Sequence, residues 1–349
     1  MRVVVVGATG NVGTSLLESL RSETEVEEIV ALARRVPTSQ FPRTTFVSAD
    51  IAHTDLVPLF RGADAVVHLA WLIQPGRDES ITGAVNVDGS RRLFKAVVDA
   101  GVPLLVYASS VGAYSPGPKD RFVNESWPTE GIASSFYSRH KATLERDLDL
   151  LERERPELRV IRMRPGLIFK AQAATEIRRL FAGPFLPGSI VTPKAIPVVP
   201  DTPGLRFQAV HSHDVGDAYR LALLSSARGP FNIAADPPIG AAELAGVLRA
   251  RAVPLSAELL RGAAALTYAL RLQPSEPGWV DMALSVPLMD TSRARTELGW
   301  APRHGARETL DELLRGLRNG SDYPTPPLAR DTSGPLRIRE LLTGVGARV

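Results

Sequence analysis

The chain begins with Arg2-Val3-Val4-Val5-Val6, and Gly7-Ala8-Thr9-Gly10-Asn11-Val12-Gly13 follows at once. The valine run is apolar on both faces, which is typical of a strand buried inside a parallel sheet. The glycines at 7, 10 and 13 permit a tight turn, and a helix is expected from about Thr14 to Arg21. A strand, a glycine-rich loop and a helix in this order predict the first unit of an α/β fold.

The same alternation continues through the first half of the chain. Strands are expected at 29–33, 45–49, 65–70, 104–109 and 159–164, with helices at 85–100 and 134–154 between them. Alternating strands and helices predict an α/β fold with a doubly wound parallel Rossmann sheet.

The second half of the chain is less regular. A strand at 208–211, a helix at 214–225 and a helical stretch at 241–272 are expected. We expect a dinucleotide-binding domain of residues 1–165 with about 205–235. A smaller, discontinuous C-terminal substrate domain would comprise 166–204 and 236–320, and 321–349 would form a C-terminal arm ending in a short amphipathic helix.

Composition excludes several classes of function. The 349 residues are 44% hydrophobic and carry a net charge of +3 from 41 basic and 38 acidic side chains, which argues against a nucleic-acid or anionic-membrane partner. The absence of cysteine excludes disulfides, thiolate zinc sites and cysteine nucleophiles. No apolar run approaches a membrane span. We expect a cytoplasmic protein that acts on a small molecule, binds no metal, and pairs as a homodimer if its two long helices associate.

The glycine loop predicts a phosphate site. Glycines let the backbone approach a pyrophosphate, and a helix N-terminus offers free N–H groups and a favourable dipole. The spacing is G-x-x-G-x-x-G, which differs from the commonest fingerprint, and an ordinary βα turn remains the alternative. The expected cofactor contacts are Gly7, Thr9, Gly10, Asn11, Val12 and Gly13.

The end of the second strand bears on the choice of cofactor. The segment Ala31-Leu32-Ala33-Arg34-Arg35 lacks the carboxylate that would bind both ribose hydroxyls of NAD. Arg34 and Arg35 could instead pair with a 2′-phosphate, which favours NADP (NADPH) and leaves NAD possible. The alternative is that both arginines are solvated surface residues. Asp50 could accept from the adenine amino group while Ile51 packs on the ring, or Asp50 could cap a helix.

Tyr137 and Lys141 are four residues apart on an expected helix and so share one face. An ammonium beside a phenol lowers the phenol pKa, which would make Tyr137 a usable acid or base near neutrality. A surface contact between the two is the alternative. Ser110 follows the strand ending at Ser109, at the sheet edge where ligands of α/β proteins bind, although Ser109 and Ser110 could simply form a turn.

With these motifs the chain resembles the extended short-chain dehydrogenase/reductase family, of the NAD-dependent epimerase/dehydratase type. The resemblance extends from residue 1 to about 315. It also rests on the following segments: His68-Leu69-Ala70, Asn86-Val87-Asp88-Gly89-Ser90, Arg164-Pro165-Gly166, Val210 to Val215, and Leu298-Gly299-Trp300-Ala301-Pro302.

The resemblance implies roles for individual residues. Tyr137 would be the catalytic acid/base, Lys141 would also bind the nicotinamide ribose, and Ser110, four residues before Tyr114, would orient the substrate. Asn86 matches an asparagine that is catalytic or structural in different branches. Leu69 and Ala70 would line the path of the adenosine and phosphates, and Pro165 and Leu167 the nicotinamide end. Trp71 and Tyr114 are expected at the substrate, with plain core packing as the alternative for Trp71.

The resemblance also limits which type of reaction is expected. Val111 and Gly112 stand where the sugar-nucleotide dehydratases of this family carry an acidic pair, so a dehydratase is not expected. The sequence favours an NADPH-dependent carbonyl reductase or alcohol dehydrogenase for a small or medium organic substrate. One alternative is a nucleotide-sugar epimerase with tightly bound NAD. Arg178, Arg179 and Arg206 could bind its diphosphate, or they could simply be solvated surface charges. Another is a non-catalytic NADP-binding regulatory protein.

Overall fold

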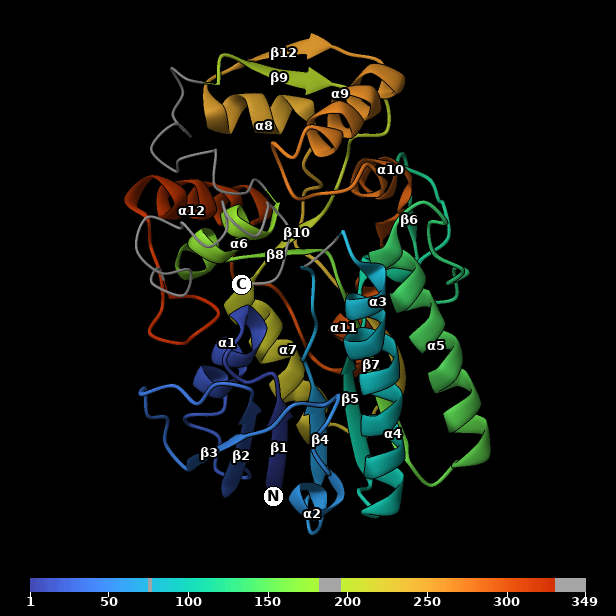
Figure 1. Cartoon of the computed structure of the whole chain (residues 1–349), viewed down its shortest axis with the longest axis vertical. Helices are drawn as coiled ribbons and strands as arrows, with labels where there is room; N and C mark the ends of the chain where they lie inside the picture. The colour runs from blue at the N-terminus through green and yellow to red at the C-terminus, as the bar shows by residue number, and fades with distance from the viewer. Residues whose placement is uncertain (75–76, 182–195, 330–349) are drawn as a thin grey trace.

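A seven-stranded parallel sheet forms the centre of the larger part of the molecule (Figure 1). The structure is a computed structural model that describes residues 1–74, 77–181 and 196–329. The strand order is β11-β7-β5-β4-β1-β2-β3, with every neighbouring pair parallel. The strands are β1 (Arg2–Val6), β2 (Glu28–Ala33), β3 (Thr44–Ser48), β4 (Ala65–His68), β5 (Leu104–Ala108), β7 (Arg159–Pro165) and β11 (Gly229–Ile233).

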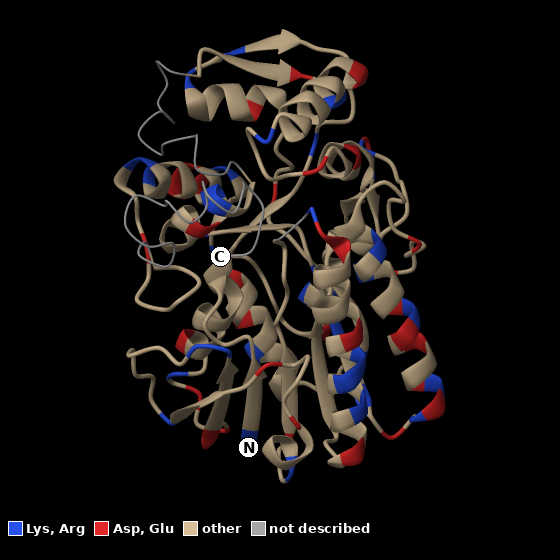
Figure 2. Ribbon diagram, viewed as in Figure 1, with Lys and Arg blue, Asp and Glu red and all other residues tan. Residues whose placement is uncertain are grey.

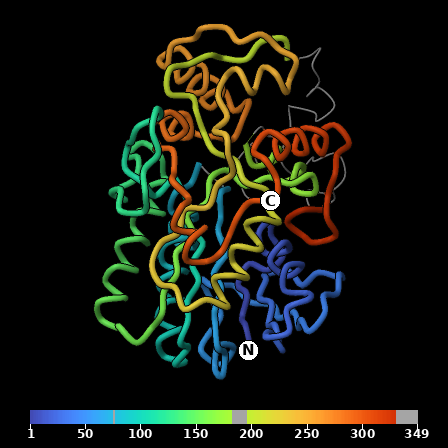
Figure 3. The backbone as a smooth tube through the Cα atoms, turned by 180° about the vertical axis from the view of Figure 1, so that it is seen from behind, coloured from blue at the N-terminus to red at the C-terminus, as the bar shows by residue number. Residues whose placement is uncertain are grey.

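Helices cover both faces of this sheet, which confirms the predicted doubly wound architecture. Val3 and Val5 of β1 face a core shared with α1 (Asn11–Ser19) and α7 (Ser212–Leu224), while Val4 and Val6 face the core beneath α4 (Gly89–Asp99) and α5 (Phe136–Glu154). Seen from behind, α7 runs alongside α1 (Figure 3). Lys, Arg, Asp and Glu residues recur along both α4 and α5 (Figure 2).

The smaller part lies at the carboxyl ends of the strands, above the sheet in Figure 1. It contains three two-stranded parallel sheets, namely β10 (Ala209–His211) with β8 (Leu167–Phe169), β12 (Arg251–Pro254) with β9 (Val198–Asp201), and β13 (Leu288–Met289) with β6 (Phe122–Val123). The remaining helices of four or more residues are α2 (Val57–Phe60), α3 (Glu79–Gly83), α6 (Ala174–Phe181), α8 (Ala241–Leu248), α9 (Ala257–Ala269), α10 (Gly278–Ser285), α11 (Ser292–Glu297) and α12 (Ala306–Asn319).

Two helical predictions were wrong in detail. The stretch 241–272 is interrupted, because Arg249 takes a left-handed conformation after α8 and the chain then pairs with β9 as strand β12. The stretch 85–100 begins with one π-helical turn at Ala84–Asp88 before α4. No helix among the described residues is long and apolar enough to cross a membrane.

The first residues of the expected C-terminal arm pack against the glycine loop. Thr325 is buried and its hydroxyl donates to the Thr9 carbonyl oxygen at 2.8 Å, while Tyr323 donates to Glu18 at 3.3 Å. Arg179 of α6 donates to the Pro327 carbonyl oxygen at 2.8 Å. Residues 321–329 therefore connect the glycine loop with α6. The amphipathic helix expected in the last fifteen residues lies outside the described residues.

Candidate active site

Packing within the protein requires glycine at two of the three glycine positions of the loop, but not at the third. Gly7 has φ +85°, and a Cβ there would lie 2.6 Å from the Ala70 nitrogen; a Cβ on Gly13 would lie 2.5 Å from the Gly7 oxygen. Both glycines are therefore required by packing within the protein. A Cβ on Gly10 would come no nearer than 3.6 Å to another atom, so the fold itself does not demand a glycine there. The surface above Gly10 is free for the close approach of a phosphate.

The start of α1 has the groups that such a phosphate needs. Gly10 is the N-cap residue, and no side chain caps the helix. The first N–H groups of α1 therefore lack side-chain acceptors, and the helix dipole favours an anion there. Asn11 donates to the Ile168 oxygen at 3.2 Å, and its own buried Oδ1 has no hydrogen-bond partner among the described residues. Val12 lies half-buried in the first turn of the same helix. These residues fit a dinucleotide pyrophosphate.

Lys170 holds this loop from the other side. Its buried ammonium donates to the Asn11 carbonyl oxygen at 2.9 Å, the Thr14 hydroxyl at 2.7 Å and the Ser15 hydroxyl at 3.0 Å. Burial lowers the pKa of Lys170 to about 8. No local sequence pattern indicates this role, because the contacts join residues that are more than 150 positions apart.

Arg34 and Arg35 are exposed directly after β2, at the carboxyl edge of the sheet. Partial burial, followed by the nearby charges of Arg34 and Arg179, lowers the pKa of Arg35. Asp50 behaves as a local cap, since its carboxylate accepts from the Ala52 nitrogen at 2.9 Å. Ile51 is buried in the core and would touch any Cβ on Gly89 at 3.0 Å.

The segment after β4 is fixed by Asn86. The fully buried Asn86 amide accepts from the Leu72 nitrogen at 2.7 Å and donates to the Leu72 oxygen at 2.8 Å. Both ends of its side chain bond to Leu72, so Asn86 positions the 69–72 segment, which is the structural one of its two expected roles. Leu69 donates its N–H to Val6, and the Ala70 backbone packs on Gly7, which places both beside the glycine loop.

Ser110 and Tyr137 come together through the start of α5. Ser135 caps this helix, and Ser138 donates to the Gly112 oxygen at 2.5 Å, which binds the helix to the turn Val111–Ala113. A Cβ on Gly112 would lie 2.9 Å from the Tyr137 ring, so only glycine permits this approach. Tyr137 is half-buried, and its side chain lies close enough to Ser110 for the two to interact. Burial raises the pKa of Tyr137, and Ser110 opposes that rise.

Lys141 lies in the predicted helix but does not lower the Tyr137 pKa as expected. Its buried ammonium lies 3.4 Å from the centroid of the Trp71 ring and donates to the Ala108 oxygen at 2.5 Å, whereas it is 5.9 Å from the Tyr137 ring centroid. Burial lowers the pKa of Lys141 well below its usual value, and the Glu145 carboxylate opposes this shift. The direction of the Tyr137 pKa shift is therefore set by burial, with Ser110 opposing it.

Glu145 is one turn beyond Lys141 and was not predicted. Its fully buried carboxylate accepts from Arg162 at 2.9 Å, from Arg164 at 2.8 Å and from the Ser109 hydroxyl at 2.5 Å. Burial acts to raise the pKa of Glu145, but the two arginines and Ser109 lower it to about 2. The series Tyr137, Lys141, Glu145 repeats the i, i+4 spacing, which is the signal that could have identified Glu145.

Tyr114 does not belong to the site. It has no exposed surface, and its hydroxyl donates to Asn232 at 2.6 Å and accepts from Arg164 at 3.0 Å. The prediction that it contacts substrate was therefore wrong, because partners on β7 and β11 draw it into the framework. Pro165 is buried at the end of β7, and Leu167 is 39% exposed at the start of β8, next to the Ile168 oxygen that binds Asn11.

Two indole rings flank Tyr137. The Trp71 ring centroid lies 5.6 Å from that of Tyr137, and the Trp279 centroid lies 4.9 Å away. Trp279 belongs to α10 of the smaller part and was not predicted, since nothing in its local sequence indicates the contact.

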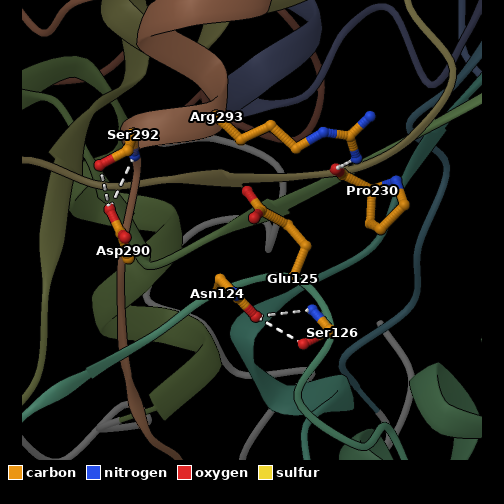
Figure 4. A pocket seen from close by; sticks show the side chains of 7 residues that line it. All are labelled: Asn124, Glu125, Ser126, Pro230, Asp290, Ser292 and Arg293. Atoms are coloured by element: carbon orange, nitrogen blue, oxygen red, sulfur yellow. Dashed lines mark hydrogen bonds between the residues drawn. The ribbon is translucent and has the colours of Figure 1, made fainter.

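A cavity of about 530 Å³ lies elsewhere, beside the β11 edge of the sheet (Figure 4). Asn124 and Asp290 each accept within their own turns, from Ser126 and Ser292. None of the predicted site residues lines this cavity, whose lining is Asn124, Glu125, Ser126, Pro230, Asp290, Ser292 and Arg293.

Comparison with known proteins agrees with this geometry. A sequence model of the NAD dependent epimerase/dehydratase family matches residues 3–234. The uncharacterized protein Rv2047c of Mycobacterium tuberculosis is 28% identical over 321 residues, covering 91% of this chain but 30% of its own length. The uncharacterized protein Rv0501 of the same organism is 26% identical over 333 residues, covering 90% of this chain and 83% of its own. The chain thus spans less than a third of the first of these relatives.

Solved structures share the fold. The UDP-glucose 4-epimerase of Thermus thermophilus in complex with NAD superposes with a TM-score of 0.67 at 22% identity, over 91% of this chain and 99% of that one. The dTDP-glucose 4,6-dehydratase DesIV of Streptomyces venezuelae with NAD bound gives 0.68 at 20% identity, over 93% and 99%. Because the family model matches more than half of the chain, the protein belongs to the NAD dependent epimerase/dehydratase family.

Proposed function

We propose that the protein is an NADPH-dependent reductase of an organic carbonyl compound, with Ser110, Tyr137 and Lys141 as its catalytic residues. The observation that carries this proposal is that Tyr137 of α5 packs on the turn that begins at Ser110, which brings the two hydroxyl side chains together at the carboxyl end of β5. Two hydroxyls at this edge of the sheet can bind one substrate oxygen together, and ligands of open α/β sheets bind at this edge.

Tyr137 would supply the proton. The bound cofactor would supply the hydride to the carbonyl carbon. Because burial raises the pKa of Tyr137, the phenol stays protonated at neutral pH and can donate to the substrate oxygen as negative charge develops there. Ser110 would hold the same oxygen. Lys141 would reach the cofactor's ribose only if the Trp71 ring or its own ammonium shifts, since the two are in contact.

The preference for NADPH is supported by Arg34 and Arg35. Both guanidinium groups are exposed at the end of β2, and β2 ends in Ala33 where a carboxylate would favour NAD. Two arginines match the geometry and charge of a 2′-phosphate.

The test compares the binding of NADPH and NADH to the wild type and to Arg34→Ala and Arg35→Ala. Removing one charge-assisted contact is expected to weaken NADPH binding by about tenfold, corresponding to about 1.5 kcal/mol, while NADH binding stays unchanged. Arg92→Ala, on the outer face of α4, is the control. Equal losses for both cofactors, or none, would count against the 2′-phosphate site.

The chemical role is tested separately. Tyr137→Phe is expected to abolish turnover and leave NADPH binding within about twofold, because only the hydroxyl is lost. Undiminished turnover in Tyr137→Phe would refute the mechanism, whereas a wild type that binds NADPH but turns over no carbonyl substrate would favour a non-catalytic NADP-binding protein.

A nucleotide-sugar epimerase is the second candidate, favoured by the likeness to the Thermus thermophilus enzyme. Such an enzyme would retain its cofactor through an internal oxidation and reduction. The purified protein should then release stoichiometric NAD on denaturation, whereas a reductase should be isolated without nucleotide and bind added NADPH.

A further inference from the structure

Aromatic side chains from separate segments meet around the proposed proton donor. Trp71 follows β4, Trp279 lies on α10, and both rings contact Tyr137 at centroid distances of 5.6 Å and 4.9 Å. Phe181, at the end of α6, extends this group with a centroid distance of 4.9 Å to Trp279. All three of these rings are half-buried, so each keeps part of its surface accessible.

Helix α10, which carries Trp279, packs against the start of α5, which carries Tyr137. A Cβ on Gly278 would lie 2.2 Å from the Ser134 oxygen, so α10 packs directly on the start of α5. Glu276 accepts from the Phe136 nitrogen at 2.9 Å and fixes the same junction. Met282, one turn along α10, would touch a Cβ on Gly112 at 3.0 Å. The apolar surface beside Tyr137 is therefore built before any substrate arrives.

Two of the three arginines that could bind a nucleotide diphosphate already donate to backbone oxygens of the protein. Arg179 donates to the Pro327 oxygen, and Arg206 donates to the Lys119 oxygen, both at 2.8 Å. Lys141 is covered by the Trp71 ring. A diphosphate requires charge-assisted donors, whereas an aromatic surface selects apolar and planar groups.

We propose that the substrate is an aromatic carbonyl compound whose ring packs against Trp71 and Trp279 while its oxygen is bound by Tyr137 and Ser110. This inference rests on the proposed reductase function. The carbonyl carbon accepts a hydride from NADPH, which becomes NADP⁺. The carbonyl π pair moves to oxygen, which takes the Tyr137 proton, and the tyrosinate regains a proton from water. The product is the corresponding alcohol.

The first test measures binding without turnover. Acetophenone is titrated into the protein saturated with NADP⁺, which cannot reduce it, and tryptophan emission is recorded. Of the four tryptophans, Trp300 is buried with its N–H bonded to Asp214, and Trp127 is bonded to Ser115, so Trp71 and Trp279 should report the ligand. Trp279→Phe should reduce the quenching, whereas the control Trp127→Phe should not. Quenching by UDP-glucose but not by acetophenone would overturn the proposal.

The second test uses turnover. Acetophenone is expected to exceed its saturated counterpart, cyclohexyl methyl ketone, by about tenfold in kcat/KM, because an aromatic pair is favoured beyond its buried area. Trp279→Leu should abolish this preference mainly through KM, with circular dichroism confirming the fold. Equal rates for both ketones in the wild type, with turnover still dependent on Tyr137, would refute the substrate class alone. Turnover that does not depend on Tyr137 would refute the proposed function itself.

Discussion

Glu145→Gln removes the single carboxylate shared by two buried arginines. Glu145 has no exposed surface, and Arg162 and Arg164 are 4% and 3% exposed. Glutamine has nearly the same shape but carries no charge, and its amide N–H₂ would face a guanidinium donor. Arg162 keeps Asp149 and Glu152 as partners, whereas Arg164 otherwise donates to neutral oxygens of Tyr114 and Glu125. The penalty therefore falls mainly on Arg164.

The magnitude follows from the Glu145 pKa. Burial acts to raise it, yet the hydrogen bonds and charges of the arginines bring it from 4.5 to about 2. A difference of roughly 2.5 pKa units corresponds to about 3 kcal/mol of preference for the ionised form in the folded protein. The loss of one partner from a buried ion pair costs about 3–5 kcal/mol, which agrees.

The assay is equilibrium urea unfolding of the wild type and of Glu145→Gln at pH 7. We expect the midpoint to fall by an amount equivalent to about 3 kcal/mol with an unchanged m value. The control is Asp147→Asn on the same helix, which breaks the exposed pair with Arg91 and should cost no more than about 1 kcal/mol.

The pH dependence gives a further check. A carboxyl whose pKa is depressed on folding stabilises the protein fully above its unfolded pKa, near 4.5, and loses that contribution as the pH falls towards 2. The difference between wild type and Glu145→Gln should therefore shrink across this range. A difference in unfolding free energy below about 1 kcal/mol at pH 7, or one that does not change with pH, would refute this account of Glu145 and its two arginines.

Two further predictions concern the cofactor loop and the proton donor. Gly10→Val would place a side chain where the fold leaves open space for a phosphate. NADPH binding, measured by fluorescence titration, should therefore weaken at least about tenfold while Tm stays within a few degrees. A large fall in Tm would show that the fold itself requires this glycine. Because burial raises the Tyr137 pKa, the rate of carbonyl reduction at saturating substrate should be flat through neutral pH and fall only above about pH 10. Alcohol oxidation needs the phenolate, so its rate should rise with pH. A reduction rate that falls between pH 6 and 8 would contradict this assignment.

Local rules account for what the sequence predicts well. The valine run and glycine loop predict β1 and α1 because a buried strand and a tight turn depend on neighbouring residues. The i, i+4 rule places Tyr137 and Lys141 on one face of α5, and the strand-end rule places Ser110 beside them. These rules need no knowledge of distant contacts.

Long-range contacts explain the features that local sequence patterns do not predict. The hydroxyl of Tyr114 is bonded to Arg164 and Asn232, which are 50 and 118 residues away, so its burial is invisible to local patterns. The same holds for Trp279, whose position depends on the packing of α10 against Ser134. Helical periodicity predicts a helix through 251–254. The segment instead forms β12, because it pairs with β9.

Helix α5 links the stability of the fold to the chemistry of the site. Tyr137, Lys141 and Glu145 form one row along it, and Glu145 is fixed by arginines of β7 at one end of that row. The same carboxylate is the charge that opposes the fall of the Lys141 pKa, and it binds Ser109 next to Ser110. An uncharged residue at 145 would therefore lower the Lys141 pKa further and loosen Ser110. Glu145, held by Arg162 and Arg164, thus influences both the position of the Ser110 hydroxyl and the charge of Lys141.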